Sequence, residues 1–235
     1  MSQFPDVISK EAFIAQVRGQ LIVSCQALPD EPLHGAPIMA RMAIAAQLGG
    51  AKGIRANGVE DIRAIRQAVD LPLIGLYKDG AEGVYITPSS WHAQAVIAAG
   101  AHVVAFGATR RPRPNGERVS DLLRVIHAQN RLALADVATL EEARAAQADG
   151  ADFIAPTLNG YTDETADNAT PDFDLIRAMV AALDVPIIAE GHINTPQQAR
   201  QALACGVLAV VVGSAITRPQ LITANFVRQI NAPLG

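Results

Sequence analysis

Eight short apolar runs recur along the chain, and they are the clearest pattern in the sequence. The runs begin near positions 21, 51, 72, 102, 132, 152, 186 and 207 and read LIVSC, AKGIRA, PLIGLY, HVVAFG, LALAD, DFIAP, PIIAE and VLAVVVG. They do not alternate apolar with polar residues, and such runs are typical of strands that are buried on both faces of a parallel sheet. We therefore predict eight parallel strands.

The stretches between these runs show helical spacing, with Ala, Leu, Ile and Val on one side and Arg, Gln and Glu opposite. Clear examples are 36–48, 59–69, 139–150 and 195–206, and two of them open with a capping residue and end at glycine. Eight strand–helix units in 235 residues favour a closed (β/α)8 barrel, the TIM barrel, over an open doubly wound α/β sheet. We predict a single domain over residues 1–235, with an additional helix near the N-terminus.

The composition narrows the functional class. Half of the residues are hydrophobic, 18% are charged and the formal net charge is −4, which argues against a nucleic-acid-binding surface. Cys25 and Cys205 lie in apolar surroundings and indicate reduced packing residues of a cytoplasmic protein. No leader pattern and no run of 18 apolar residues is found, so neither export nor membrane spanning is indicated. The histidines show no metal-ligand spacing, so no metal is assigned, and a homo-oligomer is left open.

Polar residues stand where the predicted strands end. In a (β/α)8 barrel the active residues lie at the carboxyl ends of the strands. Read in order, these ends carry Gln26, Arg55, Lys78, Asp136 and Glu190. Charged groups are costly to bury unless they are paired, so four of them together with a glutamine at the open end of one barrel indicate a polar site. The alternative is that each marks only the point where the chain regains polarity.

The last strand carries a signal for an anion. In VVVGSAITRP at 210–219, Gly213 and Ser214 follow an apolar strand and precede a short helical segment, with Arg218 beyond. Barrels frequently bind phosphate here, together with the loop after strand 7, which in this chain holds Gly191. We predict that these four residues bind phosphate and that the substrate is a phosphorylated small molecule. Each glycine could instead serve only a tight turn.

Nine strings spread over nearly the whole chain resemble one known family, in the family's order. They are SCQALPDEPLH, GIRANG, IGLYKD, ITPS, ATRRPRP, LADVAT, TLNGYT, IIAEGHI and VVGSAITRP. The family is that of the bacterial N-acetylmannosamine-6-phosphate 2-epimerases of sialic acid catabolism. The resemblance implies a cofactor-free interconversion of N-acetylmannosamine 6-phosphate and N-acetylglucosamine 6-phosphate.

The resemblance also implies roles for single residues. It carries the family's acid/base pair onto Lys78 and Glu190, and the phosphate-holding positions onto the four residues predicted above. Two positions depart from the family pattern, since Gly107 stands where aspartate is frequent and Ala138 where serine is usual. The substrate-binding residues that it implies are Gln26, Arg55, Asp136, Thr157 and Tyr161.

The chemistry explains why a lysine would stand at a strand end. Inversion at C2 requires removal of the proton beside the C1 aldehyde of the opened sugar, and its return to the opposite face. An ordinary lysine is protonated at neutral pH, but burial in an apolar strand lowers its pKa, while neighbouring carboxylates raise it. Lys78 is one of only three lysines, and we expect both influences on it, from its own strand and from Asp79 and Glu190.

Other residues receive structural interpretations. Tyr77 should face away from Lys78 and pack, and Trp91, at the start of a helix, should lie in the core. We expect His192 to be a variable loop residue. The polar segment NGYTDETADNATP, with Asp163 and Glu164, should form a mobile lid over the mouth.

Two other functions stay open at this stage. A Schiff-base aldolase on the same barrel would use Lys78 as a covalent nucleophile. A non-catalytic sugar-phosphate sensor would bind the same ligand without turning it over. The sequence shows no DNA-binding or output segment, because the predicted barrel uses the whole chain, and this favours an enzyme.

Overall fold

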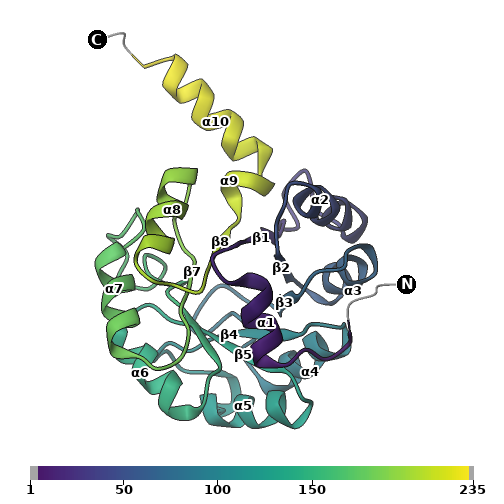
Figure 1. Ribbon diagram of the computed structural model, residues 1–235, viewed down its shortest axis with the longest axis vertical. Coiled ribbons are helices and arrows are strands. Elements are labelled where there is room, and N and C mark those ends of the chain that lie inside the picture. The colour runs from purple at the N-terminus through teal and green to yellow at the C-terminus, as the bar shows by residue number, and fades with distance from the viewer. Residues whose placement is uncertain (1–4, 233–235) are drawn as a thin grey trace.

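The eight predicted strands form one parallel sheet that closes on itself (Figure 1). The computed structural model describes residues 5–232. The strand order is β6-β5-β4-β3-β2-β1-β8-β7, and a parallel bridge between Ile154 and Ile187 joins the two ends. The predicted (β/α)8 barrel is therefore confirmed. The strands are β1 Leu21–Cys25, β2 Gly53–Asn57, β3 Leu73–Leu76, β4 Val103–Gly107, β5 Leu132–Asp136, β6 Phe153–Ala155, β7 Ile188–Ala189 and β8 Ala209–Val212.

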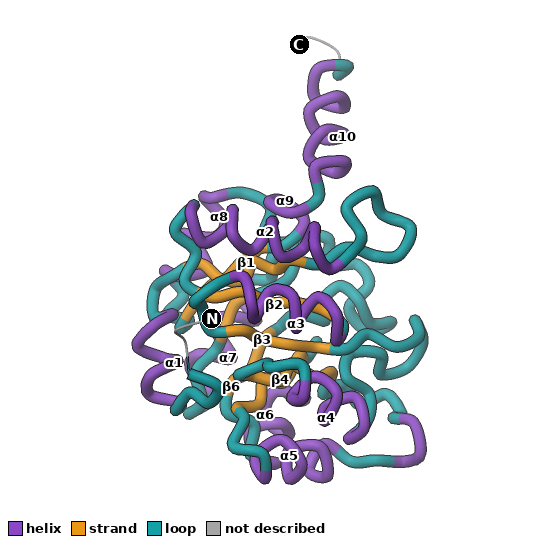
Figure 2. The backbone as a smooth tube through the Cα atoms, turned by 90° about the vertical axis from the view of Figure 1, so that its right-hand side faces the viewer, coloured by secondary structure: helices purple, strands orange, loops and turns teal. Residues whose placement is uncertain are grey.

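Helices surround the strands and connect them, as Figure 2 shows. The four clearest predicted helices all form, and so does the helix expected near the N-terminus. Within residues 5–232, none of the helices combines the length and apolar character that crossing a membrane requires. The helices are α1 Lys10–Val17, α2 Ala36–Leu48, α3 Val59–Ala68, α4 Ser90–Ala98, α5 Val119–Ala128, α6 Leu140–Asp149, α7 Phe173–Ala182, α8 Pro196–Ala204, α9 Ser214–Thr217 and α10 Pro219–Ile230.

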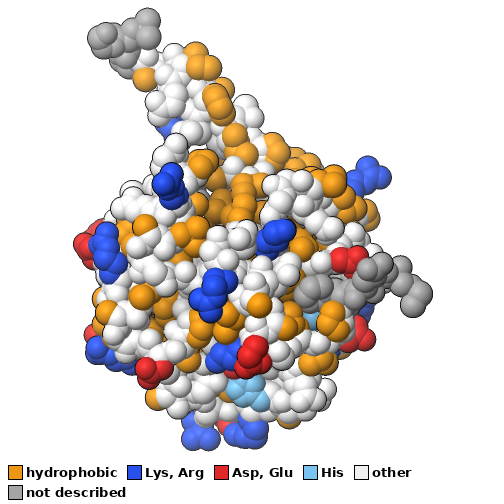
Figure 3. Space-filling view, viewed as in Figure 1, with side chains coloured by type: hydrophobic (Ala, Val, Ile, Leu, Met, Phe, Trp, Pro, Cys, Tyr) orange, Lys and Arg blue, Asp and Glu red, His pale blue; other side chains and the backbone are white. Residues whose placement is uncertain are grey.

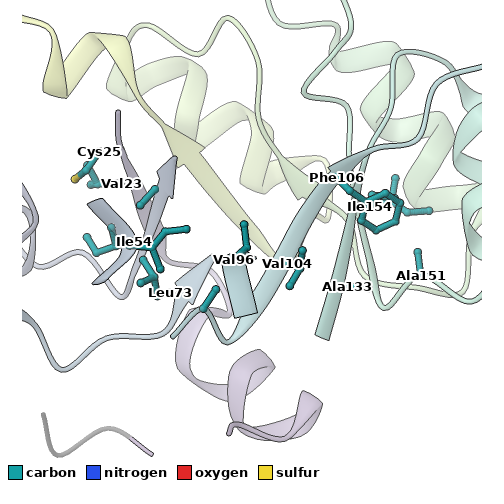
Figure 4. Close-up of a cluster of buried hydrophobic side chains, with 14 of the residues drawn as sticks. Val23, Cys25, Ile54, Leu73, Val96, Val104, Phe106, Ala133, Ala151 and Ile154 are labelled. Atoms are coloured by element: carbon teal, nitrogen blue, oxygen red, sulfur yellow. The ribbon is translucent and has the colours of Figure 1, made fainter. Parts of the chain in front are cut away.

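The core consists of two layers, which explains why the strands are apolar throughout. One layer lies between the strands and the outer helices, and Figure 4 shows part of it, including Ile54, Val104 and Phe106. The other layer fills the barrel, where Phe13 and Val17 of α1 join the inward-facing strand residues. Because α1 closes the amino-terminal end of the barrel, the open mouth lies at the carboxyl ends of the strands.

Trp91 does not lie in the core, so that prediction was wrong. Its side chain is 62% exposed, at the start of α4. It covers its neighbours instead, with its ring edge-on to His92 at 4.8 Å and to Tyr77 at 5.9 Å. The first turn of α4 faces the open end of the barrel, where a large ring is only partly covered. Tyr77 does pack against the core, as expected.

The last helix, α10, departs from the regular barrel arrangement. It projects away from the barrel instead of folding back over β8 (Figures 1 and 2), and none of its residues is buried. Phe226 is 65% exposed and Ile230 is 75% exposed. The surface that a returning helix would cover forms an apolar groove of about 430 Å³, which includes Leu21, Leu203 and Val212.

The close packing of β3 against the outer helices gives a first prediction. A Cβ on Gly75 would lie 2.6 Å from Ala101 Cβ and 2.7 Å from Val96 Cγ1. We expect Gly75→Ala to destabilise the protein by about 1–3 kcal/mol, because the buried neighbours must move. Urea unfolding measures this difference.

Gly49→Ala is the matched control. Gly49 has an ordinary φ of −72°, and a Cβ there would meet no atom closer than 3.4 Å. Its stability should change little or rise slightly, since alanine restricts the unfolded chain. Equal losses at both positions would contradict the packing argument.

Candidate active site

A cavity of about 270 Å³ opens at the carboxyl ends of the strands. Ten of the eleven predicted site residues line it, although they come from six different strand ends and the loops that follow. Asp136 is the exception, because it is fully buried beneath the cavity floor. The lining residues are Ser24, Gln26, Arg55, Lys78, Tyr85, Ile86, Thr157, Leu158, Tyr161, Glu190, Gly191, His192, Ile193, Asn194, Val211, Gly213, Ser214, Thr217 and Arg218.

Arg55 forms the floor of the cavity and joins two carboxylates. It is 1% exposed, and its Nη2 donates to Asp136 Oδ2 at 2.6 Å. Its Nη1 donates to Asp136 Oδ1 at 3.1 Å and also to Glu190 Oε2. A buried cation requires such partners, and the paired donors hold the Asp136 carboxylate in one plane. The guanidinium thus connects the ends of β2 and β5 with the loop after β7.

Lys78 lies two residues beyond the end of β3 and lines the cavity. Burial lowers the pKa of its ammonium, and the guanidinium groups of Arg55 and Arg218 lower it further, while Glu190 and Asp136 act in the opposite direction. The net result is a lysine pKa below the ordinary value. Such a lysine loses its proton more readily at neutral pH than a solvent-exposed lysine does.

Asp79 does not take part in this arrangement, contrary to the expectation from sequence. Its side chain is 64% exposed, and its Oδ2 accepts a hydrogen bond from His92 Nε2 at 3.1 Å. It is not among the charges that shift the pKa of Lys78. Consecutive side chains of an extended segment point to opposite sides, so Asp79 turns away from the cavity that Lys78 faces.

Glu190 is held in an environment that disfavours its charge. Burial raises its pKa to about 7; Arg55 opposes this rise, whereas the nearby Asp136 carboxylate adds to it. Glu190 therefore titrates near neutral pH, beside a lysine whose pKa is lowered. Groups with such opposed shifts in one cavity can exchange protons with a bound molecule.

Gln26 and Thr157 provide neutral polar groups around these charges. Gln26 Nε2 donates to Ser24 Oγ at 2.8 Å. Its Oε1 is buried and has no hydrogen-bond partner within the part of the chain that the structure describes, so it can accept from a ligand. The hydroxyl of Thr157 donates to Asp136 Oδ1 at 2.6 Å. Ser24 was missed from the sequence, although it precedes Gln26 by two positions and so shares its face of the strand.

The four predicted phosphate-binding residues all line the cavity. Gly191 has a φ of +114°, which favours glycine. A Cβ on Gly213 would lie 3.3 Å from Ser24 Cβ, so a side chain at this position would crowd Ser24. Arg218 donates to Ser214 Oγ at 3.4 Å and pairs with Glu31 at 3.0 Å. Nothing in the sequence singles out Glu31 as the partner of Arg218.

Two aromatic rings lie over the mouth. Tyr161, which is 53% exposed, stacks on His192 with ring centroids 4.7 Å apart and planes 5° apart. His192 was expected to be an ordinary loop residue, but it lines the cavity and has a φ of +55°. Tyr85 also lines the cavity and was missed, because its segment returns towards β3 only in the folded chain. Burial raises the pKa of both Tyr85 and Tyr161.

The two positions that depart from the family pattern lie outside the cavity lining. Gly107 ends β4, and its carbonyl accepts a hydrogen bond from the guanidinium of Arg113. Ala138 is 1% exposed, and its N–H donates to Glu142 Oε2 at 2.8 Å. Neither side chain faces the groups that line the cavity. Among residues 5–232, no three His, Cys, Asp or Glu side chains are grouped so that they could hold a metal ion.

Comparison with known proteins gives a consistent result. Residues 39–232 match the model of the family described as "Putative N-acetylmannosamine-6-phosphate epimerase". A Clostridium perfringens protein named "Putative N-acetylmannosamine-6-phosphate 2-epimerase" is 49% identical over 213 residues, which is 89% of this chain and 96% of that protein. A Clostridioides difficile protein of the same name is 48% identical over 217 residues, covering 92% of this chain and 97% of that one.

A solved structure is also similar along its whole length. The N-acetylmannosamine-6-phosphate 2-epimerase from Clostridium perfringens superposes with a TM-score of 0.89 at 46% identity. The match covers 92% of this chain and 95% of that chain. The similarity therefore includes the strand ends and loops that form the cavity.

The raised pKa of Glu190 predicts a pH-dependent stability. In the folded protein this pKa lies near 7, above the ordinary value of 4.5. The stability that protonation of Glu190 contributes is complete below pH 4.5 and is lost as the pH rises through about 7. Glu190→Gln cannot lose a proton. Its stability relative to wild type should therefore increase, by at most about 1.4 kcal/mol per pH unit, between pH 5 and pH 7.

Urea unfolding at pH 5, 6, 7 and 8 measures this difference. Glu164→Gln, on the exposed loop after β6, controls for the removal of one negative charge. A Glu190→Gln difference that stays constant across the four pH values would contradict the assignment.

Proposed function

The chain belongs to the N-acetylmannosamine-6-phosphate epimerase family, and we propose that it interconverts N-acetylmannosamine 6-phosphate and N-acetylglucosamine 6-phosphate. The observation that carries this proposal is the position of Lys78, a lysine of lowered pKa in a cavity that also holds Glu190, a carboxyl group of raised pKa, and the guanidinium of Arg218. The first two groups suit proton transfer. Arg218, with its neighbouring glycines, suits an anion.

Lys78 is the proposed proton carrier. The opened sugar presents a C2–H bond beside the C1 aldehyde, so the electrons left after deprotonation spread onto the carbonyl oxygen. Neutral Lys78 removes the proton, and the resulting ammonium or a neighbouring group returns a proton to the opposite face of C2. The reaction uses no redox step, and the chain's own side chains are sufficient for it. General acid–base catalysis of this kind typically contributes about 10²–10⁴-fold in rate.

Arg55 and the two carboxylates surround this lysine. The guanidinium of Arg55 donates to Asp136 and Glu190, so we propose that the main role of Arg55 is to orient these two carboxylates. Asp136 is proposed to act from beneath the substrate, through its hydrogen bonds with Arg55 and Thr157. Glu190, which titrates near neutral pH, is the proposed partner for proton transfer. Gln26 Oε1 is free to accept from a substrate N–H or O–H, and Tyr161 is proposed to contact the sugar.

The phosphate is proposed to bind beside Arg218. A guanidinium donates to phosphate oxygens in a planar fork, and glycine backbone at Gly191 and Gly213 lets N–H groups approach an anion. Ser214 adds a hydroxyl group. Binding energy from the phosphate, remote from C2, can then be used at the reacting carbon. The charge on the substrate also supports a cytoplasmic enzyme, because a sugar phosphate does not cross a bilayer unaided.

The aldolase and sensor alternatives are not favoured by the family. An aldolase would form an imine between Lys78 and its substrate, and borohydride reduction would trap that adduct. A sensor would bind the sugar phosphate and leave the C2 proton in place.

We also propose that two copies of the chain assemble by exchanging α10. The exposed apolar residues of α10 include Leu221, Phe226 and Val227, and the apolar groove beside β8 lacks the covering helix that the barrel pattern provides elsewhere. Figure 3 shows apolar side chains along α10 and on the surface at its base. Because α10 points away from its own groove, a second copy can offer its α10 there, and a two-fold axis makes the exchange mutual.

The proton-transfer proposal predicts a defined isotope outcome. In D2O, the protein should convert N-acetylmannosamine 6-phosphate to N-acetylglucosamine 6-phosphate that carries deuterium at C2. Proton NMR measures the loss of the C2–H signal. Lys78→Ala should lose at least about 10²-fold in rate, and Lys78→Arg should fail as well because a guanidinium stays protonated.

Lys52→Ala is the matched control, since this lysine lies outside the cavity, and it should retain full activity. Thermal melting checks that each variant is folded. An active Lys78→Arg enzyme, or a borohydride-trapped adduct on Lys78, would overturn the mechanism.

The exchange of α10 predicts a dimer whose stability depends on the apolar face of that helix. Light scattering after size exclusion should give twice the mass of one chain. Phe226→Asp should shift the protein to the monomer, because burial of a phenylalanine is worth about 1.5–3 kcal/mol. Gln229→Glu, on the same helix, is the control and should stay dimeric. A wild-type monomer at all concentrations would contradict the exchange.

A further inference from the structure

Lys78 lies outside the regular hydrogen-bonded ladder of the barrel, which raises the question of what fixes its position. β3 ends at Leu76, and its pairing with β4 stops at Gly75 and Val104. Beyond that point, residues 84–87 return antiparallel to residues 77–79, with a bridge between Lys78 and Ile86. This returning segment is inserted between the end of β3 and the end of β4, since the N–H of Gly107 donates to Ile86 O at 2.9 Å.

Thr87 is the residue of this segment with the most unusual backbone. Its φ is +44°, in a region that a β-branched residue rarely adopts. Its side chain is completely buried and does not line the cavity. A strained conformation of this kind, worth about 1–3 kcal/mol, persists only where the surrounding contacts enforce it.

The contacts of Thr87 explain how the conformation is maintained. Its hydroxyl accepts from the N–H of Tyr77 at 3.1 Å and donates to the carbonyl of Ala105 at 2.6 Å. Its own N–H donates to Tyr77 O at 2.7 Å. One side chain therefore joins the residue that precedes Lys78 to the neighbouring strand β4. A non-hydroxylic side chain would leave both of these buried backbone groups unsatisfied.

Arg113 reinforces the same segment from the loop after β4. It is 9% exposed, and its guanidinium donates to Pro88 O at 3.2 Å and to the carbonyl of Gly107. Its charge lies over the ring of Phe106, 5.8 Å from the centroid. Arg113 belongs to the basic string ATRRPRP, and its guanidinium binds backbone carbonyls of the returning segment and of β4.

Two further bonds complete the support of Lys78. The N–H of Lys78 donates to Asn57 Oδ1 at 2.8 Å, from the end of β2. The N–H of Asp79 donates to Tyr85 O at 2.9 Å. The backbone on both sides of Lys78 is thus held by the returning segment, and that segment is held by Thr87 and Arg113.

We propose that Thr87 is a positioning residue, which Arg113 supports and which fixes the backbone that carries Lys78 so that its amine reaches C2 of the substrate. This inference rests on the proposed function of Lys78. Thr87 does not line the cavity, so its effect should appear in the chemical step and not in phosphate binding, which is proposed for Gly191, Gly213, Ser214 and Arg218.

The test compares four variants with the wild type. Thr87→Val keeps the shape and the strain but lacks the hydroxyl, and it should lose about 10²-fold in kcat with little change in KM, as a misplaced base does. Thr87→Ser keeps the hydroxyl and should retain kcat. Thr87→Gly adopts the backbone without strain, so it should fold, and it should lose kcat as the valine variant does. Ser9→Ala, which removes a helix-capping hydroxyl at the closed end of the barrel, should lower the melting temperature only.

A second readout does not depend on turnover. Because the chain has three lysines, ¹³Cε-lysine labelling gives three signals, from Lys10, Lys52 and Lys78. In Thr87→Val and Thr87→Gly, the pKa of Lys78 should rise from its lowered value, while in Thr87→Ser it should stay as in the wild type. A folded Thr87→Gly protein with wild-type kcat and an unchanged Lys78 titration would overturn the inference.

The two proposals can fail separately. A wild-type protein that does not epimerise the sugar phosphate would refute the proposed function, and the lysine titration would still decide whether Thr87 positions Lys78.

Discussion

The buried guanidinium of Arg55 is the constraint on which the rest of the mouth depends. Because Arg55 is only 1% exposed, its charge requires nearby negative charge. Asp136 of β5 and Glu190 of the loop after β7 provide it. Burying such a triad is costly unless every donor and acceptor is well placed. The strand ends are therefore held in a fixed relation. The same positive charge disfavours a second cation nearby, which is one reason why the pKa of Lys78 lies below its ordinary value.

The cavity lining then holds two groups of residues with different chemistry. Around Lys78 the groups are ionisable and their pKa values are shifted by burial and by each other. Around Arg218 the groups are a guanidinium, a hydroxyl and glycine backbone, which suit a permanent anion. Glu31 connects Arg218 to α10, because it pairs with Arg218 and accepts a hydrogen bond from Gln220 in the first turn of that helix. Arg218, which is proposed to bind phosphate, and α10, which is proposed to be exchanged, thus contact the same carboxylate, that of Glu31.

The failures of the sequence analysis at the site share a physical cause. Strand ends could be aligned from the sequence, so ten of the eleven predicted residues lie around one cavity. What one side chain does to another depends on direction and distance. Asp79 was expected to act on Lys78, yet it pairs with His92, and Asp136 was expected at the substrate, yet it lies beneath Arg55. Tyr85 and Thr87 could not be found, because the segment that carries them becomes part of the mouth only when it folds back against residues 77–79.

The sequence by itself determined the fold and the general location of the site. Apolar runs without alternation require burial on both faces, and helical stretches between them leave a parallel barrel as the solution. Local patterns of this kind are encoded within a few residues, so they can be read directly. The tertiary structure alone decided which charges are paired, which pKa values shift, and where α10 lies. These properties arise between residues far apart in the chain, such as Arg55 and Glu190, whose interaction exists only once the barrel has closed.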